Sequence, residues 1–413
     1  MLEVAPFAAI RYDLDHVEGD LSSLLAPPYD VLDQADKDAL LARSDRNIVA
    51  VDLPHIPPKS AGPQEAYAAS AQRLEEWLSD GTLVRERQPS IYVYHQRFRQ
   101  GGKTYARRMF IARVRLVPFS EGVVLPHERT FGGPKEDRLA LMKATCCQLS
   151  PIFGLFTDPH DEVGEALAAT ADARPDAVGE LDGVENLLWI ESDESAIEEV
   201  ASAFADKRIY IADGHHRYGT ALMYRDWRAE QSGGKLPEDH PANYVMFVLA
   251  SMDDPGCVIL PYHRALAGVT LAAVLSAWTP GTEPAPAGQA DIVLYDGATG
   301  AEHPLRFTQR DKLKALAPAE CALWHQLDAA YLHRYLIDDL LKTALAREPQ
   351  VRYLKSADDA RRTAREEAGV ALLVNATPMA HLRAVSEAGG LMPQKSTYFY
   401  PKLATGMTMY PLT

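Results

Sequence analysis

The chain has 413 residues, of which 47% are hydrophobic and 24% are charged, as in a globular protein with a substantial core. Its formal net charge is −15, which argues against a protein whose main task is to grip nucleic acid, because such binding relies on a basic surface. A small anionic substrate is still compatible with this charge, since a local basic pocket can lie in an acidic protein. The length predicts about two or three domains.

The sequence carries no recognisable targeting or membrane signal. Its first residues lack a basic region followed by an apolar one, so we expect no signal peptide. No apolar run approaches the roughly 20 residues that cross a bilayer. The four cysteines lack the spacings of a zinc site. We therefore expect reduced cysteines, a cytoplasmic location and no membrane partner.

Residues 1–90 predict mixed α/β structure. Two prolines make a rigid turn of Ala26–Val31, because each fixes its own φ and disfavours helix at the residue before it. The apolar run Ile48–Leu53, followed by a proline, predicts a strand. Ala66–Leu78 has the apolar spacing of an amphipathic helix, with Tyr67, Ala71, Leu74 and Leu78 on its apolar stripe.

The next segment predicts a hairpin. Ile91–Tyr94 begins the first strand, Arg108–Val114 forms the second, and residues 100–103, with two glycines, form the turn between them. A further short apolar strand is predicted over Ile152–Phe156. The stretch between the hairpin and that strand is largely polar and charged.

The second half of the chain predicts a strand, a helix and another strand in its first part. Ile209–Ala212 is a short apolar run, Thr220–Trp227 has a helical pattern, and Tyr244–Leu249 is strongly apolar. Residues 280–288, rich in proline and glycine, resemble a linker. A long helical pattern follows near residues 325–346.

The most informative motif is Asp213-Gly214-His215-His216-Arg217, between the strand and the helix. The first free N–H groups of a helix attract anions, and a glycine lets a ligand approach the backbone closely. Arginine forms a bidentate fork to phosphate or carboxylate, and histidine can donate to phosphate or act as an acid or base. Asp213 could hold a magnesium ion or accept a proton. The alternative interpretation is a solvated turn that happens to be rich in these residues.

A second group of polar residues follows an apolar strand at Pro126–Thr130. Glu128 lies between His127 and Arg129, and a carboxylate in that setting could act as a general base for a hydroxyl group. We assign contacts with the substrate to His127, Thr130 and Arg138. A solvated loop with salt bridges would give the same pattern.

The third group is Lys395-Ser396-Thr397, with Lys402 nearby. A lysine followed by two hydroxyls could clamp a phosphate, although the glycines of a P-loop are missing. An exposed loop is the alternative. The motifs of serine hydrolases, zinc peptidases and dinucleotide-binding dehydrogenases are also missing from the sequence.

Together these motifs resemble a known group of proteins. The chain resembles the bacterial domain-of-unknown-function family 1015 from end to end. The residues that carry this resemblance are Ala26–Val31, His127–Thr130, Asp213–Tyr218 and Met392–Thr397.

The Asp-Gly-His-x-Arg turn is also similar to the signature turn of the ParB/sulfiredoxin-like superfamily, especially of its free-serine kinases. This resemblance implies that the turn Asp213–Arg217 binds phosphate and that a carboxylate, for which Glu128 is the candidate, activates the serine hydroxyl. Sulfiredoxins have a cysteine in this turn where this chain has His215, so sulfinic acid reduction is not expected. Lys395, Ser396 and Thr397 have no counterpart in the small serine kinases.

The resemblance implies an α/β (α+β) fold with a ParB/sulfiredoxin-like core and additional α/β segments at both ends. We expect an N-terminal α/β segment over residues 1–115 and the catalytic core over 116–262. A C-terminal α/β segment over 263–413 is expected to return to the active site.

The expected function is transfer of a phosphoryl group to a small hydroxyl substrate. The expected substrate is free L-serine, and the product is O-phospho-L-serine. His215, His216, Arg217 and Lys395–Thr397 would surround the phosphates. Asp213 would hold Mg²⁺ and act in catalysis with His216, and Glu128 would take the hydroxyl proton. The donor (ATP, ADP or pyrophosphate), the direction of the reaction and the oligomeric state stay open. A phosphoserine phosphatase and a non-catalytic nucleotide-binding regulatory module are the alternatives, and we expect no nucleic acid partner.

Overall fold

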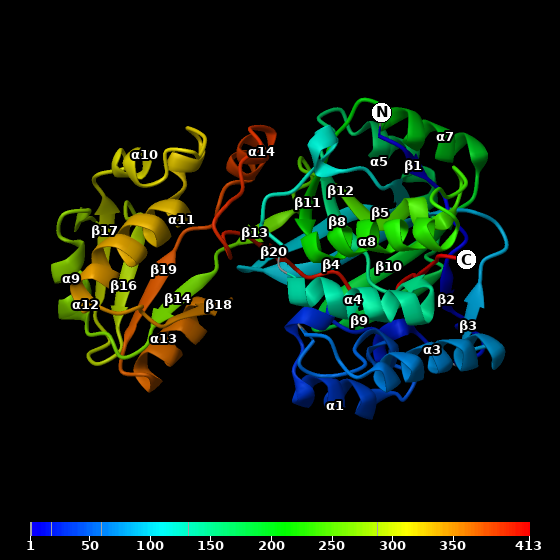
Figure 1. The fold of residues 1–413 in the computed structure, drawn as a ribbon, viewed down its shortest axis with the longest axis horizontal. Helices are drawn as coiled ribbons and strands as arrows, with labels where there is room; N and C mark the ends of the chain where they lie inside the picture. Colours follow the sequence, from blue (N-terminus) through cyan, green and yellow to red (C-terminus); the bar gives the residue numbers. More distant parts are fainter. Residues whose placement is uncertain (1, 18, 59, 131, 287) are drawn as a thin grey trace. The chain divides into compact units, whose positions relative to one another are not determined.

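The computed structural model describes residues 2–17, 19–58, 60–130, 132–286 and 288–413. The chain packs into two compact units (Figure 1). Unit 1 runs to Pro126 and comprises also Thr130–Cys257 and Pro401–Thr413, and unit 2 comprises His127–Arg129 and Val258–Tyr400. Both units mix helices and strands, so the predicted α/β class is confirmed. The functional division at residues 116 and 263 stays a prediction.

Unit 1 is built on a nine-stranded mixed sheet. Strands β11 and β6 are parallel, as are β8 and β12, while the other neighbours are antiparallel. In spatial order the strands are β6 (Val124–Leu125), β11 (Ile209–Asp213), β8 (Ile152–Phe156), β12 (Tyr244–Ser251), β5 (Lys103–Arg115), β4 (Ile91–Gln100), β10 (Val184–Glu191) and β9 (Ala177–Leu181), with β1 (Val4–Ala5) beside β5.

The predicted hairpin is confirmed as β4 and β5. Gln100 pairs with Lys103, which leaves Gly101 and Gly102 as a two-residue turn. Both glycines have positive φ, 57° and 79°, the conformation that a tight hairpin turn requires and that glycine adopts without steric cost. The predicted strands over β8, β11 and β12 are confirmed as well.

Helices cover the sheet of unit 1, with α8 lying across it in Figure 1. The core beneath consists of large apolar side chains from the central strands, such as Phe110, Ile211 and Phe247. The helices of unit 1 are α1 (Gln34–Arg43), α2 (Val49–Asp52), α3 (Gln64–Ser79), α4 (Gly132–Thr145), α5 (Glu162–Ala166), α6 (Ala168–Ala171), α7 (Glu194–Ala203) and α8 (His215–Gln231). Its short elements are η1 (Leu21–Ser23), η2 (Tyr29–Val31), η3 (Phe119–Glu121), η4 (Pro241–Asn243), β2 (Ile10–Tyr12) paired with β3 (Leu83–Arg85), and β7 (Cys147–Gln148) paired with β21 (Tyr410–Pro411).

The strand predicted over Ile48–Leu53 is wrong, because this segment forms the short helix α2. The buried Asn47 side chain accepts a hydrogen bond from the Val49 N–H at 3.0 Å and donates to two carbonyls of the η1 region. This local side-chain bond favours a turn over a strand. The β-branched valines are buried all the same, so tertiary context overrides their strand propensity.

The predicted helix over Ala66–Leu78 is confirmed as α3, with one change in its buried stripe. Tyr67 and Leu74 are buried as expected. Leu78 is exposed, and Trp77 packs into the core in its place. A helix of 3.6 residues per turn can turn either of these neighbouring positions inward, and the larger side chain buries more apolar surface.

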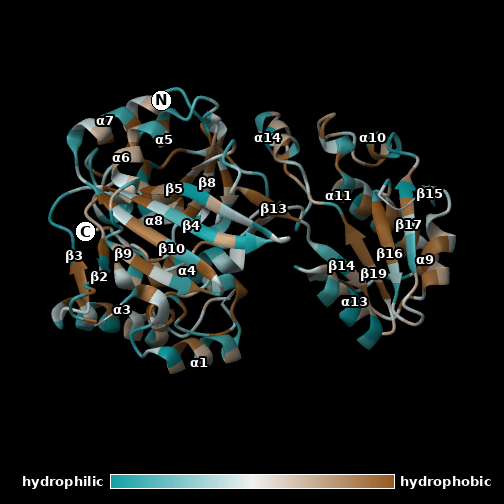
Figure 2. Ribbon diagram, turned by 180° about the vertical axis from the view of Figure 1, so that it is seen from behind, coloured by the Kyte–Doolittle hydropathy of each residue, from teal (hydrophilic) through white to brown (hydrophobic). Residues whose placement is uncertain are grey.

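Unit 2 contains a six-stranded antiparallel sheet, in which β16 and β19 are largely hydrophobic (Figure 2). The strands lie in the order β15 (Thr282–Pro284), β17 (Glu302–Phe307), β16 (Ile292–Asp296), β19 (Val370–Val374), β14 (His263–Leu266) and β18 (Val351–Leu354), and β13 (Val258–Leu260) pairs separately with β20 (Tyr398–Tyr400). The helices are α9 (Leu271–Trp278), α10 (Lys312–Leu316), η5 (Trp324–Gln326), α11 (Asp328–Ala330), η6 (Tyr331–Leu341), α12 (Lys342–Leu345), α13 (Ala357–Glu366) and α14 (Met379–Glu387).

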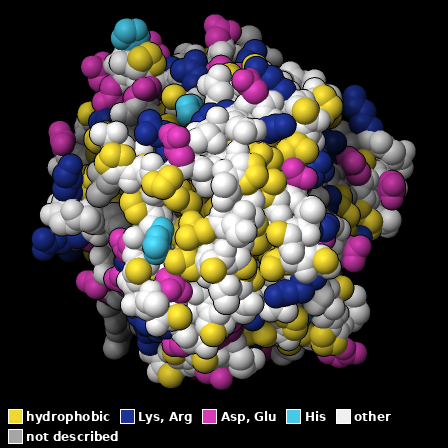
Figure 3. All heavy atoms as spheres, turned by 90° about the vertical axis from the view of Figure 1, so that its left-hand side faces the viewer, with side chains coloured by type: hydrophobic (Ala, Val, Ile, Leu, Met, Phe, Trp, Pro, Cys, Tyr) yellow, Lys and Arg dark blue, Asp and Glu magenta, His cyan; other side chains and the backbone are white. Residues whose placement is uncertain are grey.

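Two sequence predictions concern unit 2. The helical pattern near 325–346 is confirmed by η5, α11, η6 and α12. The linker expected over 280–288 is wrong in part, because Thr282–Pro284 forms the edge strand β15; Ala287 lies outside the described residues. Proline is compatible with an edge strand, where its missing N–H is not needed. Figure 3 looks onto unit 2 from the side of α9 and α12 and shows acidic and basic side chains interspersed with apolar ones.

All four cysteines are free thiols, and Cys147 is buried. Among the helices of the described residues, none combines the length and the apolar composition that crossing a membrane requires.

Candidate anion-binding site

The turn between β11 and α8 is shaped by a glycine. Gly214 precedes the 17-residue helix α8 and has φ 94° and ψ 25°. A Cβ atom there would lie 2.9 Å from Nε of Arg217, so a larger residue would both strain the backbone and displace the guanidinium. The register of β11 against β8 shifts between Ile211 and Asp213, an irregularity often found next to active sites. The turn therefore presents the N-terminus of a long helix, where backbone N–H groups favour an anion.

Asp213 is the one carboxylate of this turn, and cations surround it. Its Oδ2 lies 2.8 Å from Nζ of Lys402, and its Oδ1 accepts the Gly214 N–H at 2.8 Å and lies 3.7 Å from Nη2 of Arg217. Burial by itself would raise the pKa of the Asp213 carboxyl, but the Lys402 ammonium and the Arg217 guanidinium outweigh it and hold the pKa well below its usual range. Asp213 is therefore ionised at neutral pH.

Arg217 and Arg107 add two more cations on this part of unit 1. Arg217 is largely buried and donates to the carbonyl of Pro151, just before β8. Arg107 has an exposure of 0% and donates through Nη2 to the Pro401 carbonyl at 2.7 Å and to the Gln96 side chain. Its guanidinium carbon lies 4.8 Å from the ring centroid of Phe153.

Two contacts indicate that Arg107 lies near the turn between β11 and α8. Phe153, which it covers, pairs with Asp213 in the β8–β11 register, and Pro401, which accepts from it, precedes Lys402. Within the described residues, Nε and Nη1 of Arg107 have no hydrogen-bond partner. A buried guanidinium with unsatisfied N–H groups is costly, and these N–H groups are able to donate to an acceptor. We call Arg107, Arg217 and Lys402, together with Asp213, the cation cluster.

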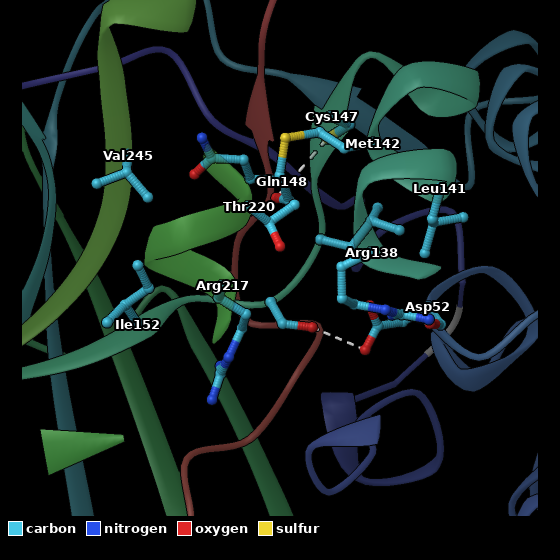
Figure 4. Close-up of a pocket in the computed structure, with 12 residues that line it drawn as sticks. Asp52, Arg138, Leu141, Met142, Cys147, Gln148, Ile152, Arg217, Thr220 and Val245 are labelled. Atoms are coloured by element: carbon cyan, nitrogen blue, oxygen red, sulfur yellow. Dashed lines mark hydrogen bonds and ion pairs between the residues drawn. The ribbon is translucent and has the colours of Figure 1, made fainter. Parts of the chain in front are cut away.

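Arg217 also lines a small cavity of about 40 Å³ in unit 1. Figure 4 shows Arg217 entering from α8 on one side and Arg138, from α4, beside Asp52 on the other. Nη1 of Arg138 donates to the Asp52 carbonyl at 2.6 Å, and the Ser150 hydroxyl donates to Oδ2 of Asp52 at 2.7 Å. Burial raises the pKa of the Asp52 carboxyl, and the charge of Arg138 offsets part of this increase. The cavity thus contains one paired carboxylate, and much of its lining is apolar, including Leu141, Ile152 and Val245.

Arg138 is held on its other side by a fully buried carboxylate. Asp137 pairs with Arg138 at 2.8 Å and accepts from the Tyr67 hydroxyl at 2.8 Å, while Nε2 of His55 lies 2.7 Å from Oδ1. The Arg138 guanidinium carbon is also 4.0 Å from the ring centroid of Tyr29, in the Pro-Pro-Tyr turn singled out in the sequence. These contacts immobilise Arg138, and its contact with the substrate stays a prediction.

The residues of the second motif are divided between the two units. His127, in unit 2, is buried, and its Nε2 lies 3.0 Å from the Thr397 hydroxyl. Its carbonyl accepts the Met392 N–H at 2.7 Å. The structure therefore joins His127 of the second motif to Thr397 of the third within unit 2. Glu128 is half-buried beside His127, and Thr130 is half-buried in unit 1, in the segment before α4.

The Lys395-Ser396-Thr397 segment is a tightly bonded turn of unit 2. Lys395 has a positive φ of 58°, which a lysine seldom adopts. Its carbonyl accepts from Nη2 of Arg264 at 3.1 Å, and the Ser396 carbonyl accepts the Thr377 hydroxyl at 2.8 Å. The Ser396 hydroxyl donates to the Pro393 carbonyl at 2.5 Å. Both hydroxyls of the predicted phosphate clamp thus already have protein partners. To bind a phosphate, they would have to break these hydrogen bonds and form new ones with the phosphate oxygens.

Sequence reasoning missed Arg107 and did not give Lys402 its partner. Arg107 shares its face of β5 with Met109 and Ile111, which are buried. An arginine at an apolar position of a strand is unusual, and this was the available signal. In the sequence, Lys402 is recognisable only as a cation near the third motif. Its pairing with Asp213 could not be predicted, because it depends on where the C-terminal segment lies in the folded chain.

The side chains around Asp213 offer few oxygen ligands for a magnesium ion. Among the described residues, no group of three or more His, Cys, Asp and Glu side chains is placed to hold a metal ion. Asp213 is a single carboxylate whose Oδ2 faces an ammonium. These residues alone do not fit a resident Mg²⁺, which usually takes one or two carboxylates together with substrate phosphates and water. Magnesium at Asp213 therefore stays a prediction for the donor-bound protein.

Comparisons with known proteins agree with the sequence resemblance. A family model described as "Protein of unknown function (DUF1015)" matches residues 4–330. A solved mutant of a free serine kinase, in complex with ADP, is similar over 72% of this chain and 92% of its own, at 12% identity and a TM-score of 0.36. SbnI from Staphylococcus aureus, with a C-terminal truncation, is similar over 73% and 87%, at 13% identity and a TM-score of 0.38.

A conserved hypothetical protein from Pyrococcus furiosus is similar over 72% of this chain and 95% of its own, at 12% identity and a TM-score of 0.34. No curated protein matches the chain in sequence. Likenesses this distant do not transfer an activity, so the functional conclusion rests on the residues of the site.

Proposed function

The chain belongs to the DUF1015 family, whose description assigns no activity, and we propose that it is a phosphotransferase acting on a small hydroxyl compound. The observation that carries this proposal is the cation cluster at the start of α8. Lys402 and Arg217 contact the single carboxylate, Asp213, at the N-terminus of α8. Arg107 lies over the ring of Phe153, the strand partner of Asp213, and donates to the Pro401 carbonyl. Such an arrangement has an excess of positive charge and favours a polyanion.

Phosphoryl transfer asks the protein mainly for positioning and charge neutralisation. In the proposed reaction the substrate hydroxyl oxygen attacks the terminal phosphorus of the donor, and the bond from that phosphorus to its bridging oxygen breaks. The leaving nucleotide or phosphate takes the electron pair. Arg217, Lys402 and Arg107 would neutralise the phosphate oxygens, with His215 and His216 of the turn beside them.

The hydroxyl proton needs an acceptor, and Glu128 is our proposal for that base. Asp213 is less suited as a base, because Lys402 and Arg217 lower its pKa and stabilise its ionised form. Asp213 would instead hold Lys402 and Arg217 in place. Lys395, Ser396 and Thr397 are proposed as further phosphate contacts, and His127, Thr130 and Arg138 as substrate contacts.

Free L-serine is our choice of substrate and O-phospho-L-serine of product. The support is the similarity of the Asp213–Arg217 turn to the turn of free-serine kinases. ATP, ADP and pyrophosphate are the candidate donors, since each presents the polyphosphate that the cation cluster favours.

The test is to incubate the full chain with L-serine, Mg²⁺ and ATP, ADP, CTP or pyrophosphate in turn, and to follow phosphoserine by ³¹P NMR. We expect phosphoserine with at least one donor. Release of phosphate from phosphoserine without any donor would instead assign a phosphatase. Nucleotide binding without turnover of any of these compounds would leave a regulatory module and contradict the proposal.

A further inference from the structure

Unit 2 contains a buried arginine that forms no ion pair with any described carboxylate. Arg264, in β14, is 1% exposed. Its Nε hydrogen bonds to Nε2 of His333 at 3.1 Å, its Nη2 to the Lys395 carbonyl at 3.1 Å, and its Nη1 to the Tyr262 carbonyl. All three partners are uncharged acceptors. Throughout the part of unit 2 that the structure describes, no carboxylate forms an ion pair with Arg264, although an uncompensated buried charge is strongly unfavourable.

Among the described residues, Arg264 has the Tyr353 ring beside it, with the ring centroid 5.5 Å from its guanidinium carbon, but no counter-charge. Burial lowers its pKa to about 10, which still leaves the guanidinium charged at neutral pH. Burial, together with the charge of Arg264, lowers the pKa of His263 to about 4 and that of His333 to about 3, so both imidazoles are neutral. An arginine has five N–H groups, and the three bonds account for three of them, so two can donate to a ligand.

Arg264 lines a cavity of about 180 Å³ within unit 2. Thr377 and Pro378, at the start of the nine-residue helix α14, line the same cavity. Pro378 occupies the N-cap position, and no side chain caps this helix. A guanidinium and an uncapped helix N-terminus thus open on one space, and both favour an anion.

The same cavity also has an acidic group. Asp328 lines it and accepts from Nη2 of Arg310 at 2.7 Å through Oδ1. Burial raises the pKa of Asp328, and the bond from Arg310 lowers it in part. The cavity thus offers a positive and a negative group to one molecule. Its volume is well below the roughly 300 Å³ at which pockets for drug-sized ligands begin, so the ligand is small.

We propose that this cavity binds a free α-amino acid, with its carboxylate on Arg264 and the N-terminus of α14 and its ammonium on Asp328. A zwitterion matches both charges and supplies the counter-charge that Arg264 lacks. Ser396 lines the cavity as well. The further step of making this amino acid the phosphoryl acceptor rests on the proposed function.

The test is isothermal titration calorimetry of the full chain with glycine and L-serine, and with ethanolamine and propionate as probes that lack one charged group. We expect both amino acids to bind. Each truncated probe should bind at least ~10-fold more weakly, since a charge-assisted hydrogen bond contributes about 1.5–3 kcal/mol. Arg264→Gln and Asp328→Asn should each lower the affinity for L-serine by a similar factor.

A blocking variant keeps the test valid should Arg264→Gln unfold. Ala329 lines the cavity, whereas Ala322 is exposed and is not part of its lining. Ala329→Phe should abolish binding, and Ala322→Phe should leave it unchanged, with thermal unfolding as the check on folding. The proposal is overturned if neither amino acid binds, or if folded Ala329→Phe and Asp328→Asn bind L-serine as the wild type does.

The outcomes for this site and for the proposed function are separable. Amino acid binding without phosphoserine formation would support the site and contradict the phosphotransferase. Phosphoserine formation that is unchanged in a folded Ala329→Phe variant, together with unchanged calorimetry, would overturn the site and leave the phosphotransferase standing.

Discussion

Lys402 and Asp213 are 189 positions apart in the chain, and their side chains form an ion pair at 2.8 Å. The sequence prediction had assigned the tail's contribution to Lys395. In the structure it is Lys402 that reaches the turn of unit 1, held there by the Pro401 and Lys402 carbonyls, which accept from Arg107 and Gln96. Lys402 thus contacts the turn of unit 1, and the phosphate contact of Lys395 stays a prediction.

The first prediction concerns this ion pair. Lys402→Met should weaken pyrophosphate binding by at least ~10-fold, because a hydrogen bond to a charged group contributes about 1.5–3 kcal/mol and the Asp213 carboxylate would lose its ion pair with Lys402 and keep only the longer one with Arg217. Calorimetry with pyrophosphate measures the change. Lys103→Met, at the exposed hairpin turn, is the matched control. Unchanged binding in a folded Lys402→Met variant would remove Lys402 from the anion site.

The second prediction tests the turn. Arg217→Ala should lower the rate of phosphoserine formation more than ~100-fold, since one lost donor to a developing oxyanion costs about 3 kcal/mol or more. Arg208→Ala, at an exposed position just before β11, should keep the wild-type rate. Circular dichroism confirms that both variants fold. Near-normal turnover in Arg217→Ala would exclude this turn from catalysis.

The third prediction assigns the base. Glu128→Gln should lose about 10²- to 10⁴-fold in turnover, as expected for a missing general base, and should still bind ADP with the wild-type affinity. Steady-state rates and calorimetry separate the two effects. The exposed Glu121→Gln is the control. Wild-type turnover in Glu128→Gln would transfer the role to Asp213, because Asp137 is fully buried in its pairs with Arg138 and Tyr67.

The fourth prediction concerns pH and the buried His263. Its folded pKa of about 4 lies below the value of 6.5 expected in the unfolded chain, so the unfolded state binds the proton more readily. The stabilising contribution of the neutral imidazole is complete above pH 6.5 and is lost as the pH falls toward 4, by roughly 3 kcal/mol in all. His263→Asn should flatten this part of the urea-unfolding profile, while His160→Gln, at an exposed site, should not. An identical slope for His263→Asn and wild type would show that His263 titrates normally.

The fifth prediction concerns magnesium. Because Asp213 already pairs with Lys402, the protein alone should show no saturable Mg²⁺ binding by calorimetry at millimolar concentration. Mg²⁺ should bind in the presence of ADP, whose phosphates supply the missing oxygens. Stoichiometric binding of Mg²⁺ without nucleotide, lost in Asp213→Asn, would reveal a resident metal site instead.

Local patterns in the sequence were sufficient for much of the fold. The paired glycines between two apolar runs predicted the β4–β5 hairpin, and the apolar run before Asp213 predicted β11, since these signals lie within a few neighbouring residues. The helix predicted over Thr220–Trp227 begins earlier, at His215. The strand predicted over 48–53 failed for the opposite reason. The bonds of the Asn47 amide to the carbonyls of Ser23 and Leu25 come from more than 20 positions away, and no local propensity contains them.

The chemistry of the site divides in the same way. The sequence by itself determined which residue types stand in the Asp213–Arg217 turn and that glycine is needed there, because a strand-to-helix turn is a local structure. Only the tertiary structure decided that Lys402 is the partner of Asp213 and that Arg107 joins them. It also decided that His127 meets Thr397 and that Arg264 is buried with no ion-pair partner in the described part of the chain. These long-range contacts depend on how strands far apart in the sequence pair and on where the C-terminal segment lies. The free energy that favours this arrangement comes from the packing of the whole core.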